Sequence, residues 1–179
     1  GGVLSSDGKT LLAVIEQVNT TYTIPASVRT IKEYAFMGVT ANVVWDANTC
    51  MDEVDKYAFS GYAGTCIELP NTIKVIGEGA FSDCENLTQI TLPNELKVIE
   101  SSAFYNCKKL SKVGYPKSWS SVPRYSSSYA PESPFAGCTA LKEIIVDEGV
   151  TDIPAVAFLN HTSIEKVILP DSLEKICSE

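Results

Sequence analysis

Cysteine and histidine are the residue types of this 179-residue sequence that could form covalent bonds or hold a metal ion. A zinc site usually shows as closely spaced pairs of cysteines combined with further cysteines or histidines. No such pair occurs here, and a single histidine, His161, is available to complete a metal site. We therefore expect no metal ligands among the six cysteines, which are Cys50, Cys66, Cys84, Cys107, Cys138 and Cys177.

Catalytic motifs are also missing from the sequence. Serine is frequent, but there is no G-x-S-x-G segment and no second histidine to serve as a base. No glycine-rich loop of the kind that holds phosphate groups occurs either. We expect no catalytic residue, no cofactor and no enzymatic activity for this chain.

Charge and hydrophobicity restrict the partners of the protein. Its formal net charge is −8 and its pI is near 4.7, so its surface repels nucleic-acid phosphates and anionic membranes. No apolar run reaches the ~18 residues of a membrane-spanning helix. The first residues, Gly1 to Leu4, lack the regions of a signal peptide. We expect no nucleic-acid partner and no membrane insertion in this segment, and these features leave the compartment open.

A repeated Ala-Phe dipeptide, once replaced by Pro-Phe, organises the chain. Successive phenylalanines lie 23, 22, 23, 31 and 23 positions apart, so one interval holds an insertion of 8 residues. These phenylalanines are Phe36, Phe59, Phe81, Phe104, Phe135 and Phe158. The apolar residues between them follow the pattern AFxxCxxLxxIxLPxxLxxI, which is clearest from Ala80 to Ile99. Such a period indicates a solenoid, in which stacked coils bury a shared core.

Each coil is expected to contain one short strand and two turns. The IxL segment alternates inward and outward residues as a strand does, and the proline after it ends the strand. The LxxI spacing turns the chain, and the Ala-Phe segment closes the coil as a short helical or 3₁₀ turn. The fold expected is an α/β solenoid, a right-handed stack with a parallel sheet of about seven short strands. In the second coil we align Trp45 with Ile90 and Ala47 with Leu92.

Both ends of the chain and one interval depart from the pattern. Residues 1–20 predict an N-terminal capping hairpin with an Asp-Gly turn, and residues 21–179 predict the repeat array. The longer interval predicts an inserted loop near 118–133, rich in serine and tyrosine. The sequence stops at Glu179, where another Ala-Phe turn is expected, so either the array is truncated or the solenoid ends abruptly.

The pattern closely resembles BspA-like leucine-rich repeats, which are about 23 residues long and occur mainly in surface proteins of gut and oral bacteria. The dipeptides that carry the resemblance most clearly are Ile24-Pro25, Leu69-Pro70, Leu92-Pro93 and Leu169-Pro170. The resemblance implies an extracellular or cell-surface location, a role in adhesion, and no catalytic motif. The weak second coil, where Asn48 replaces the proline, is one departure from the family pattern.

The repeat gives a structural explanation for the histidine and for half of the cysteines. One position of four successive repeats is occupied by Cys84, Cys107, Cys138 and His161. We expect a ladder of buried free thiols, which behave as small hydrophobic groups. A Cys84–Cys107 disulfide is the alternative, although side chains stacked in parallel have poor geometry for a bridge. The other three cysteines lie at outward positions, where they could pair or stay exposed.

The residues that flank the inward residue of each strand are expected to face outward and to form a binding surface. This outward strip consists of Thr21, Thr23, Val44, Asp46, Cys66, Glu68, Gln89, Thr91, Lys112, Gly114, Glu143, Ile145, Lys166 and Ile168. Tyrosine and arginine are common interface anchors, so Arg124, Tyr125 and Tyr129 of the inserted loop are a second candidate. The alternative interpretation of the strip is a solvated sheet face without a partner.

Two functions are compatible with these features. The first is an exported, non-catalytic binding module that adheres to a protein or glycan ligand on host or neighbouring cells. The second is a structural spacer, a repeat array that displays another domain of a longer surface protein. Neither function requires a cofactor.

Overall fold

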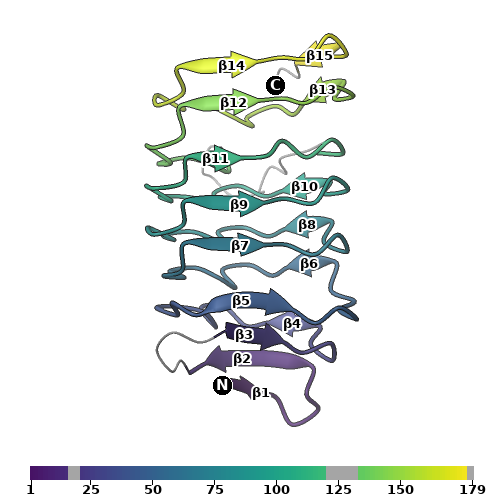
Figure 1. Ribbon diagram of the computed structural model, residues 1–179, viewed down its shortest axis with the longest axis vertical. Helices are drawn as coiled ribbons and strands as arrows, with labels where there is room; N and C mark the ends of the chain where they lie inside the picture. The colour runs from purple at the N-terminus through teal and green to yellow at the C-terminus, as the bar shows by residue number, and fades with distance from the viewer. Residues whose placement is uncertain (16–20, 120–132, 177–179) are drawn as a thin grey trace, which may run out of the picture.

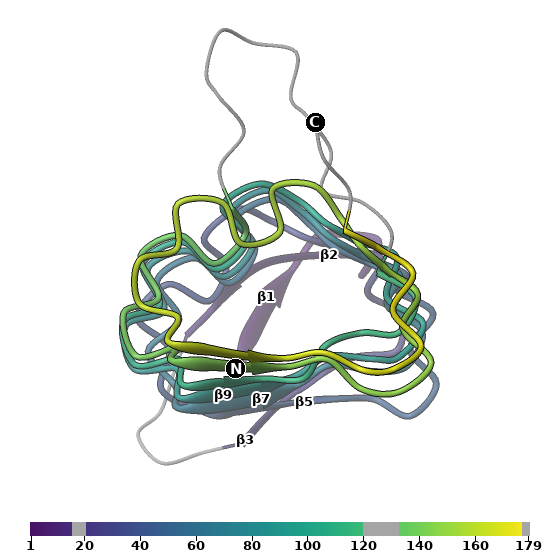
Figure 2. The same ribbon diagram turned by 90° about the horizontal axis from the view of Figure 1, so that it is seen from above.

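The computed structural model describes residues 1–15, 21–119 and 133–176. In these residues the chain winds as a right-handed stack of coils, each of which lies above the previous one (Figures 1 and 2). Strands of neighbouring coils pair in parallel, and the described residues contain no helix. The fold is a parallel β-solenoid, so the solenoid prediction is confirmed, whereas the helical part of the α/β prediction is wrong.

The front face of the solenoid carries one strand from each coil (Figure 1). These seven strands are β3 (Thr21–Ile24), β5 (Asn42–Trp45), β7 (Cys66–Glu68), β9 (Gln89–Thr91), β11 (Lys112–Val113), β12 (Glu143–Ile145) and β14 (Lys166–Ile168). They pair in three blocks, β3 with β5, then β7 with β9 and β11, then β12 with β14. The pairing breaks where a coil contains additional residues, because an insertion disturbs the alignment of neighbouring strands.

A second set of strands lies on the opposite side of the core. These two-residue strands arise from the LxxI segments and are β4 (Thr30–Ile31), β6 (Glu53–Val54), β8 (Val75–Ile76), β10 (Val98–Ile99), β13 (Asp152–Ile153) and β15 (Lys175–Ile176). The LxxI spacing was interpreted only as a turn, so these strands were not predicted. They place the last residue of LxxI inside the coil, and the isoleucines of β8 and β10 are fully buried.

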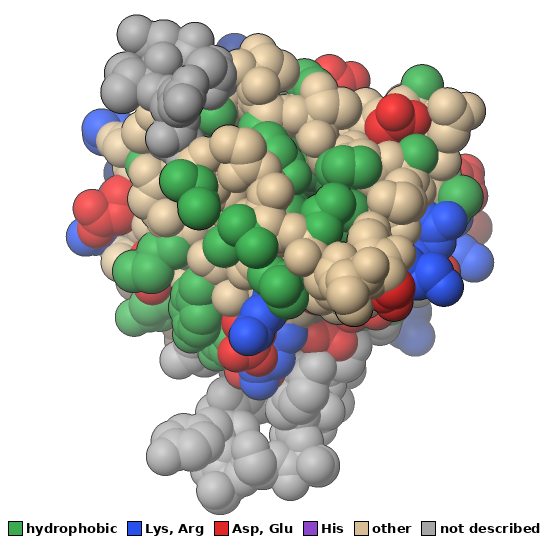
Figure 3. Space-filling model, turned by 90° about the horizontal axis from the view of Figure 1, so that it is seen from below, with side chains coloured by type: hydrophobic (Ala, Val, Ile, Leu, Met, Phe, Trp, Pro, Cys, Tyr) green, Lys and Arg blue, Asp and Glu red, His purple; other side chains and the backbone are tan. Residues whose placement is uncertain are grey.

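An antiparallel hairpin lies at the N-terminal end of the stack. It consists of β1 (Gly2–Leu4) and β2 (Thr10–Val14), and β2 pairs in parallel with β4. Gly8 has a φ of +70° in the connecting turn, where glycine adopts the left-handed conformation without strain. Figure 3, seen from this end, shows apolar side chains on the outer surface, and Val3, Leu4 and Leu12 are among the exposed ones.

The Ala-Phe segments form turns rather than helices because left-handed residues flank them. The residues two before and two after the phenylalanine have φ between +53° and +75° at Phe36, Phe59, Phe81, Phe104 and Phe158, as in Tyr57 and Gly61 around Phe59. Gly137, two after Phe135, has a φ of +78°. The backbone N–H of Phe59 donates to the carbonyl of Ala80 in the next coil at 2.8 Å, and that of Phe81 to Ala103 at 2.7 Å. A helix would direct these groups along its own axis, whereas here they join successive coils.

The phenylalanines form a continuous stack through the core, as the repeat predicted. Neighbouring rings from Phe36 to Phe158 have centroids 4.2 to 6.1 Å apart and interplanar angles of 5° to 19°. Inward leucines and isoleucines of the strands surround the rings. Each coil therefore buries its apolar side chains against the next coil, and this burial holds the stack together.

The second coil differs in register from the alignment made on its sequence. Strand pairing places Tyr22 beside Val43 and Ile24 beside Trp45. Trp45 therefore takes the position of Leu92, not of Ile90, and our alignment of this coil was wrong by two residues. A slip of two residues keeps every side chain on its predicted face. The chain accommodates the difference in the following turn, where Met51 lies five positions after Asp46, whereas Leu96 lies three positions after Pro93.

Candidate binding surface

The outward strip is on the surface of the front sheet, with one correction. Its exposed members within the seven coils are Thr21, Thr23, Cys66, Glu68, Gln89, Thr91, Lys112, Gly114, Glu143, Ile145, Lys166 and Ile168. In the second coil the residues that flank inward Val43 are Asn42 and Val44, of which Asn42 was not predicted. Asp46 lies just after β5 rather than on the face of the sheet. The outward position of Asn42 follows from the pairing of β5 with β3 and could not be obtained from our sequence alignment of this coil.

The strip changes in character along the stack. Its first coils present mainly hydroxyl, amide and β-branched groups. At the other end, Lys166 and Glu143 form an ion pair of 2.8 Å across β12 and β14, beside the paired and exposed Ile145 and Ile168. A surface with both polar and apolar side chains is compatible with a macromolecular partner. The second candidate, Arg124, Tyr125 and Tyr129, lies outside the described residues and stays a prediction.

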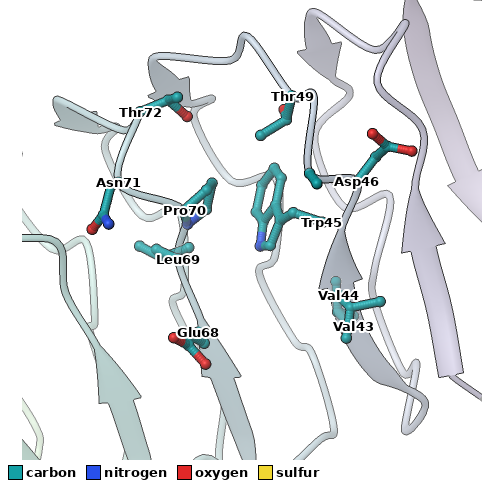
Figure 4. Close-up of a pocket in the computed structure, with 11 residues that line it drawn as sticks. Val43, Val44, Trp45, Asp46, Thr49, Glu68, Leu69, Pro70, Asn71 and Thr72 are labelled. Atoms are coloured by element: carbon teal, nitrogen blue, oxygen red, sulfur yellow. The ribbon is translucent and has the colours of Figure 1, made fainter.

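A cleft of about 480 Å³ opens beside the strip, between the turns that follow β5 and β7 (Figure 4). The second coil contributes Val43 to Ala47 and Thr49, and the third coil contributes Glu68 to Thr72. The longer turn of the second coil and the missing pairing between β5 and β7 accompany this opening. Three predicted strip residues line it, namely Val44, Asp46 and Glu68. The structure therefore brings part of the predicted surface into a concave site.

Trp45 is an aromatic side chain at the wall of the cleft (Figure 4). Its ring packs on Phe59 with centroids 6.2 Å apart and the planes tilted by 46°. Its Nε1 is buried and has no hydrogen-bond partner among the described residues. A buried donor without an acceptor costs about 1–3 kcal/mol. The aliphatic residues Ile24 and Leu69 occupy this position in the neighbouring coils without that cost.

Two carboxylates lie at the cleft, one from each coil. The Asp46 carboxylate accepts hydrogen bonds from the backbone N–H of Asn48 at 2.8 Å and from its side-chain amide at 3.3 Å. Glu68 is exposed, and no hydrogen bond or ion pair to its carboxylate is found in the described part of the chain. No lysine or arginine is among the residues that line the cleft. The cleft therefore has a negative rim around a partly aromatic wall.

The buried thiols form a ladder on the inner side of the stack. The Sγ atoms of Cys84 and Cys107 donate to the carbonyls of Phe59 and Phe81, each at 3.1 Å, and Cys138 donates to the next phenylalanine carbonyl at 3.2 Å. All three cysteines are free, which confirms the prediction of unbridged thiols. The Cys107 thiol and burial raise the pKa of Cys138, so this thiol stays protonated and unreactive.

His161 continues this ladder as a neutral side chain. Its Nδ1 lies 3.0 Å from the Ser163 hydroxyl, whose oxygen lies 3.1 Å from the Cys138 and Leu141 carbonyls. Nε2 is buried without a hydrogen-bond partner in the described residues. Burial therefore lowers the pKa of His161, and the Phe135 backbone acts in the opposite direction.

Replacing His161 by cysteine is expected to make stability less dependent on pH. Above the unfolded-state pKa near 6.5, the imidazole is neutral in both states. Below it, the unfolded chain takes up a proton that the native chain resists, so the wild type loses stability as pH falls. Urea unfolding of both proteins at pH 7.5 and 5.5 measures this difference. If the two proteins differ in free energy of unfolding by the same amount at both pH values, burial of a neutral His161 is contradicted.

No group of three or more histidine, cysteine or acidic side chains within residues 1–15, 21–119 and 133–176 is arranged to hold a metal ion. The same residues contain no helix long and apolar enough to cross a membrane.

Known proteins resemble this chain in both sequence pattern and fold. A Treponema pallidum leucine-rich repeat protein has a TM-score of 0.57 at 19% identity, and the alignment covers 98% of this chain and 82% of the Treponema protein. A leucine-rich cell-surface protein of Faecalibacterium prausnitzii has a TM-score of 0.57 at 22% identity. The aligned part spans 85% of this chain and 48% of the Faecalibacterium protein. No curated protein matches the sequence. The sequence model of the BspA type leucine-rich repeat region matches residues 16–130 and 122–179, in six copies. The chain therefore belongs to the BspA type leucine-rich repeat family.

Proposed function

We propose that the chain is an exported, non-catalytic binding module that adheres to a protein or glycan on host or neighbouring cells. The observation that carries the proposal is the outward strip, a mostly exposed face built from the same two strand positions of successive coils. Repeat scaffolds present such faces as extended binding surfaces. The surface location of the F. prausnitzii relative supports an extracellular or cell-surface location. That relative is about twice as long as the part this chain matches, so the chain is compatible with a segment of a longer surface protein.

A binding assay with matched variants tests the proposal. The chain is immobilised and exposed to extracellular-matrix proteins, to a glycan array and to whole cells. Thr91 on the front sheet and Thr30 on the opposite sheet are both exposed strand threonines, so each is replaced by arginine. We expect saturable binding that Thr91→Arg weakens about tenfold or more, because a bulky charge at the centre of an interface disrupts its packing. Thr30→Arg is expected to bind as the wild type does.

Two results would contradict this proposal. Absence of binding across the whole panel would favour a structural spacer, which needs no ligand of its own. Equal weakening by both arginine variants would place the contact outside the front sheet. A double variant of Tyr125 and Tyr129 to alanine tests the predicted loop contact in the same assay.

A further inference from the structure

The cleft beside β5 and β7 is a local departure from an otherwise regular array. Strand β5 pairs with β3 and strand β7 pairs with β9, but β5 and β7 do not pair with each other. The second coil contains two additional residues in the turn after β5, as the positions of Met51 and Leu96 show. The resulting space of about 480 Å³ is large enough for a side chain of a partner. Its residues come from two coils, so the solenoid holds both walls in place (Figure 4).

Core packing alone does not account for the tryptophan in this cleft. The neighbouring coils fill the same position with Ile24 and Leu69, which are buried and bring no polar atom into the core. Trp45 instead places an unpartnered N–H inside and leaves part of its ring accessible. An accessible indole ring beside carboxylates is a favourable surface for a cation, because its face carries negative charge.

The charges of the cleft favour the same kind of group. Asp46 and Glu68 come from neighbouring coils and point in different directions (Figure 4), and the lining residues include no base to neutralise them. Thr72 and Asn71 add polar groups at the rim (Figure 4). A planar guanidinium can donate two hydrogen bonds to one carboxylate and stack on an aromatic ring at the same time, and it is more weakly hydrated than an ammonium group.

We propose that this cleft binds the guanidinium of an arginine side chain presented by a protein partner. The inference rests on the proposed binding function and names the group that is recognised. Glu68 binds the guanidinium, the exposed part of the Trp45 ring lies against its plane, and Asp46 adds negative charge at the rim. An amino group of lysine binds more weakly because it is a strongly hydrated point charge with no plane to stack.

Nuclear magnetic resonance of the whole chain tests this proposal on the indole N–H signals. The protein has two tryptophans, and Trp119 is 2% exposed, so its signal is an internal control. The probes are N-acetyl-arginine amide, N-acetyl-lysine amide and the neutral N-acetyl-citrulline amide. We expect a saturable shift of the Trp45 signal with the arginine probe, a smaller one with lysine and none with citrulline. High salt is expected to weaken the arginine effect, because the carboxylates are near the surface.

Two variants and one control complete the design. Glu68→Gln is expected to weaken arginine binding about three- to fivefold, as for a solvated ion pair. Glu33→Gln removes the same charge at an exposed position outside the cleft lining and is expected to have no effect. Trp45→Leu introduces the residue of the next coil and is expected to abolish binding while the protein stays folded by circular dichroism. If this variant unfolds, Glu68→Gln alone decides the question.

The possible outcomes separate this inference from the proposed function. Equal shifts with arginine and citrulline, a shift with methyl glycosides alone, or no shift at all would overturn the arginine site. A macromolecule that binds equally to the wild type and to Glu68→Gln would also overturn it, but would leave the binding function intact. Arginine binding at Trp45 without any macromolecular ligand in the panel would support the site and contradict the proposed function.

Discussion

Replacement of Phe104 by alanine is expected to lower the free energy of unfolding by about 3–5 kcal/mol. The ring is fully buried and lies between Phe81 and Phe135, with centroid distances of 5.3 and 5.1 Å and interplanar angles of 5° to both. Its removal leaves a cavity in the centre of the stack, because the backbone bonds between coils keep the neighbouring rings apart. Urea denaturation followed by circular dichroism measures the loss.

Phe158→Ala is the matched control for this substitution. Phe158 occupies the same repeat position but is only partly buried, and its ring lies 6.1 Å from that of Phe135 in the last described coil. We expect a loss of about half that at Phe104 or less, because part of the ring already contacts solvent. Equal losses at the two positions would show that stability does not depend on the continuity of the aromatic stack. A biphasic curve for Phe104→Ala would indicate that the two halves of the array then unfold separately.

The regular part of the fold could be predicted because one pattern recurs many times. Ile67, Ile90 and Ile144 are buried at the centre of their strands, and the residues beside them are exposed, as the alternation required. The free thiols followed from the same argument, since Cys84 and Cys107 stand at one repeat position. Each repeat position occurs in several coils, so a chance match of residue type in one coil does not change the predicted fold.

The closing turn of each coil was wrongly predicted, although part of the signal was available. The residues two after each phenylalanine include Gly61, Asp83 and Asn106, which are the types that tolerate a left-handed backbone. The residues two before it include Tyr57 and Val156, which give no such indication. Their conformation is imposed by the bonds between coils, and these bonds cannot be seen in one repeat taken alone.

Part of the candidate site could be predicted, because side chains alternate between the two faces of a strand. The alignment of the second coil was wrong by two residues, yet Val44 was correctly placed outward because side chains alternate with a period of two. Asp46 was assigned to the sheet face and lies in the turn instead. The cleft depends on where the additional residues of this coil fold, and no pattern in the sequence shows this. Irregular coils are therefore the places where sequence reasoning about such arrays fails and where a specific site can arise.

Replacement of Gly137 by alanine is expected to lower the free energy of unfolding by about 2–3 kcal/mol, for two separable reasons. Gly137 has a φ of +78°, a conformation that costs a residue with a β-carbon about 1–2 kcal/mol. A β-carbon there would also lie 3.1 Å from the backbone N and Cα of Asn106 in the preceding coil. These backbone atoms cannot move freely, because the N–H of Asn106 donates to the carbonyl of Ala136 at 2.8 Å.

Gly38→Ala isolates the second of these reasons. Gly38 occupies the same repeat position with a φ of +75°, but a β-carbon there would have no neighbour within 4 Å. Its substitution therefore carries only the conformational cost, about 1–2 kcal/mol. Urea unfolding of both variants gives the difference, which we expect to be about 1 kcal/mol or more, from the close approach of the coils. Equal losses would mean that the coils separate readily at this turn. The hydrogen bonds between coils would then not be the cause of the left-handed backbone in the turn.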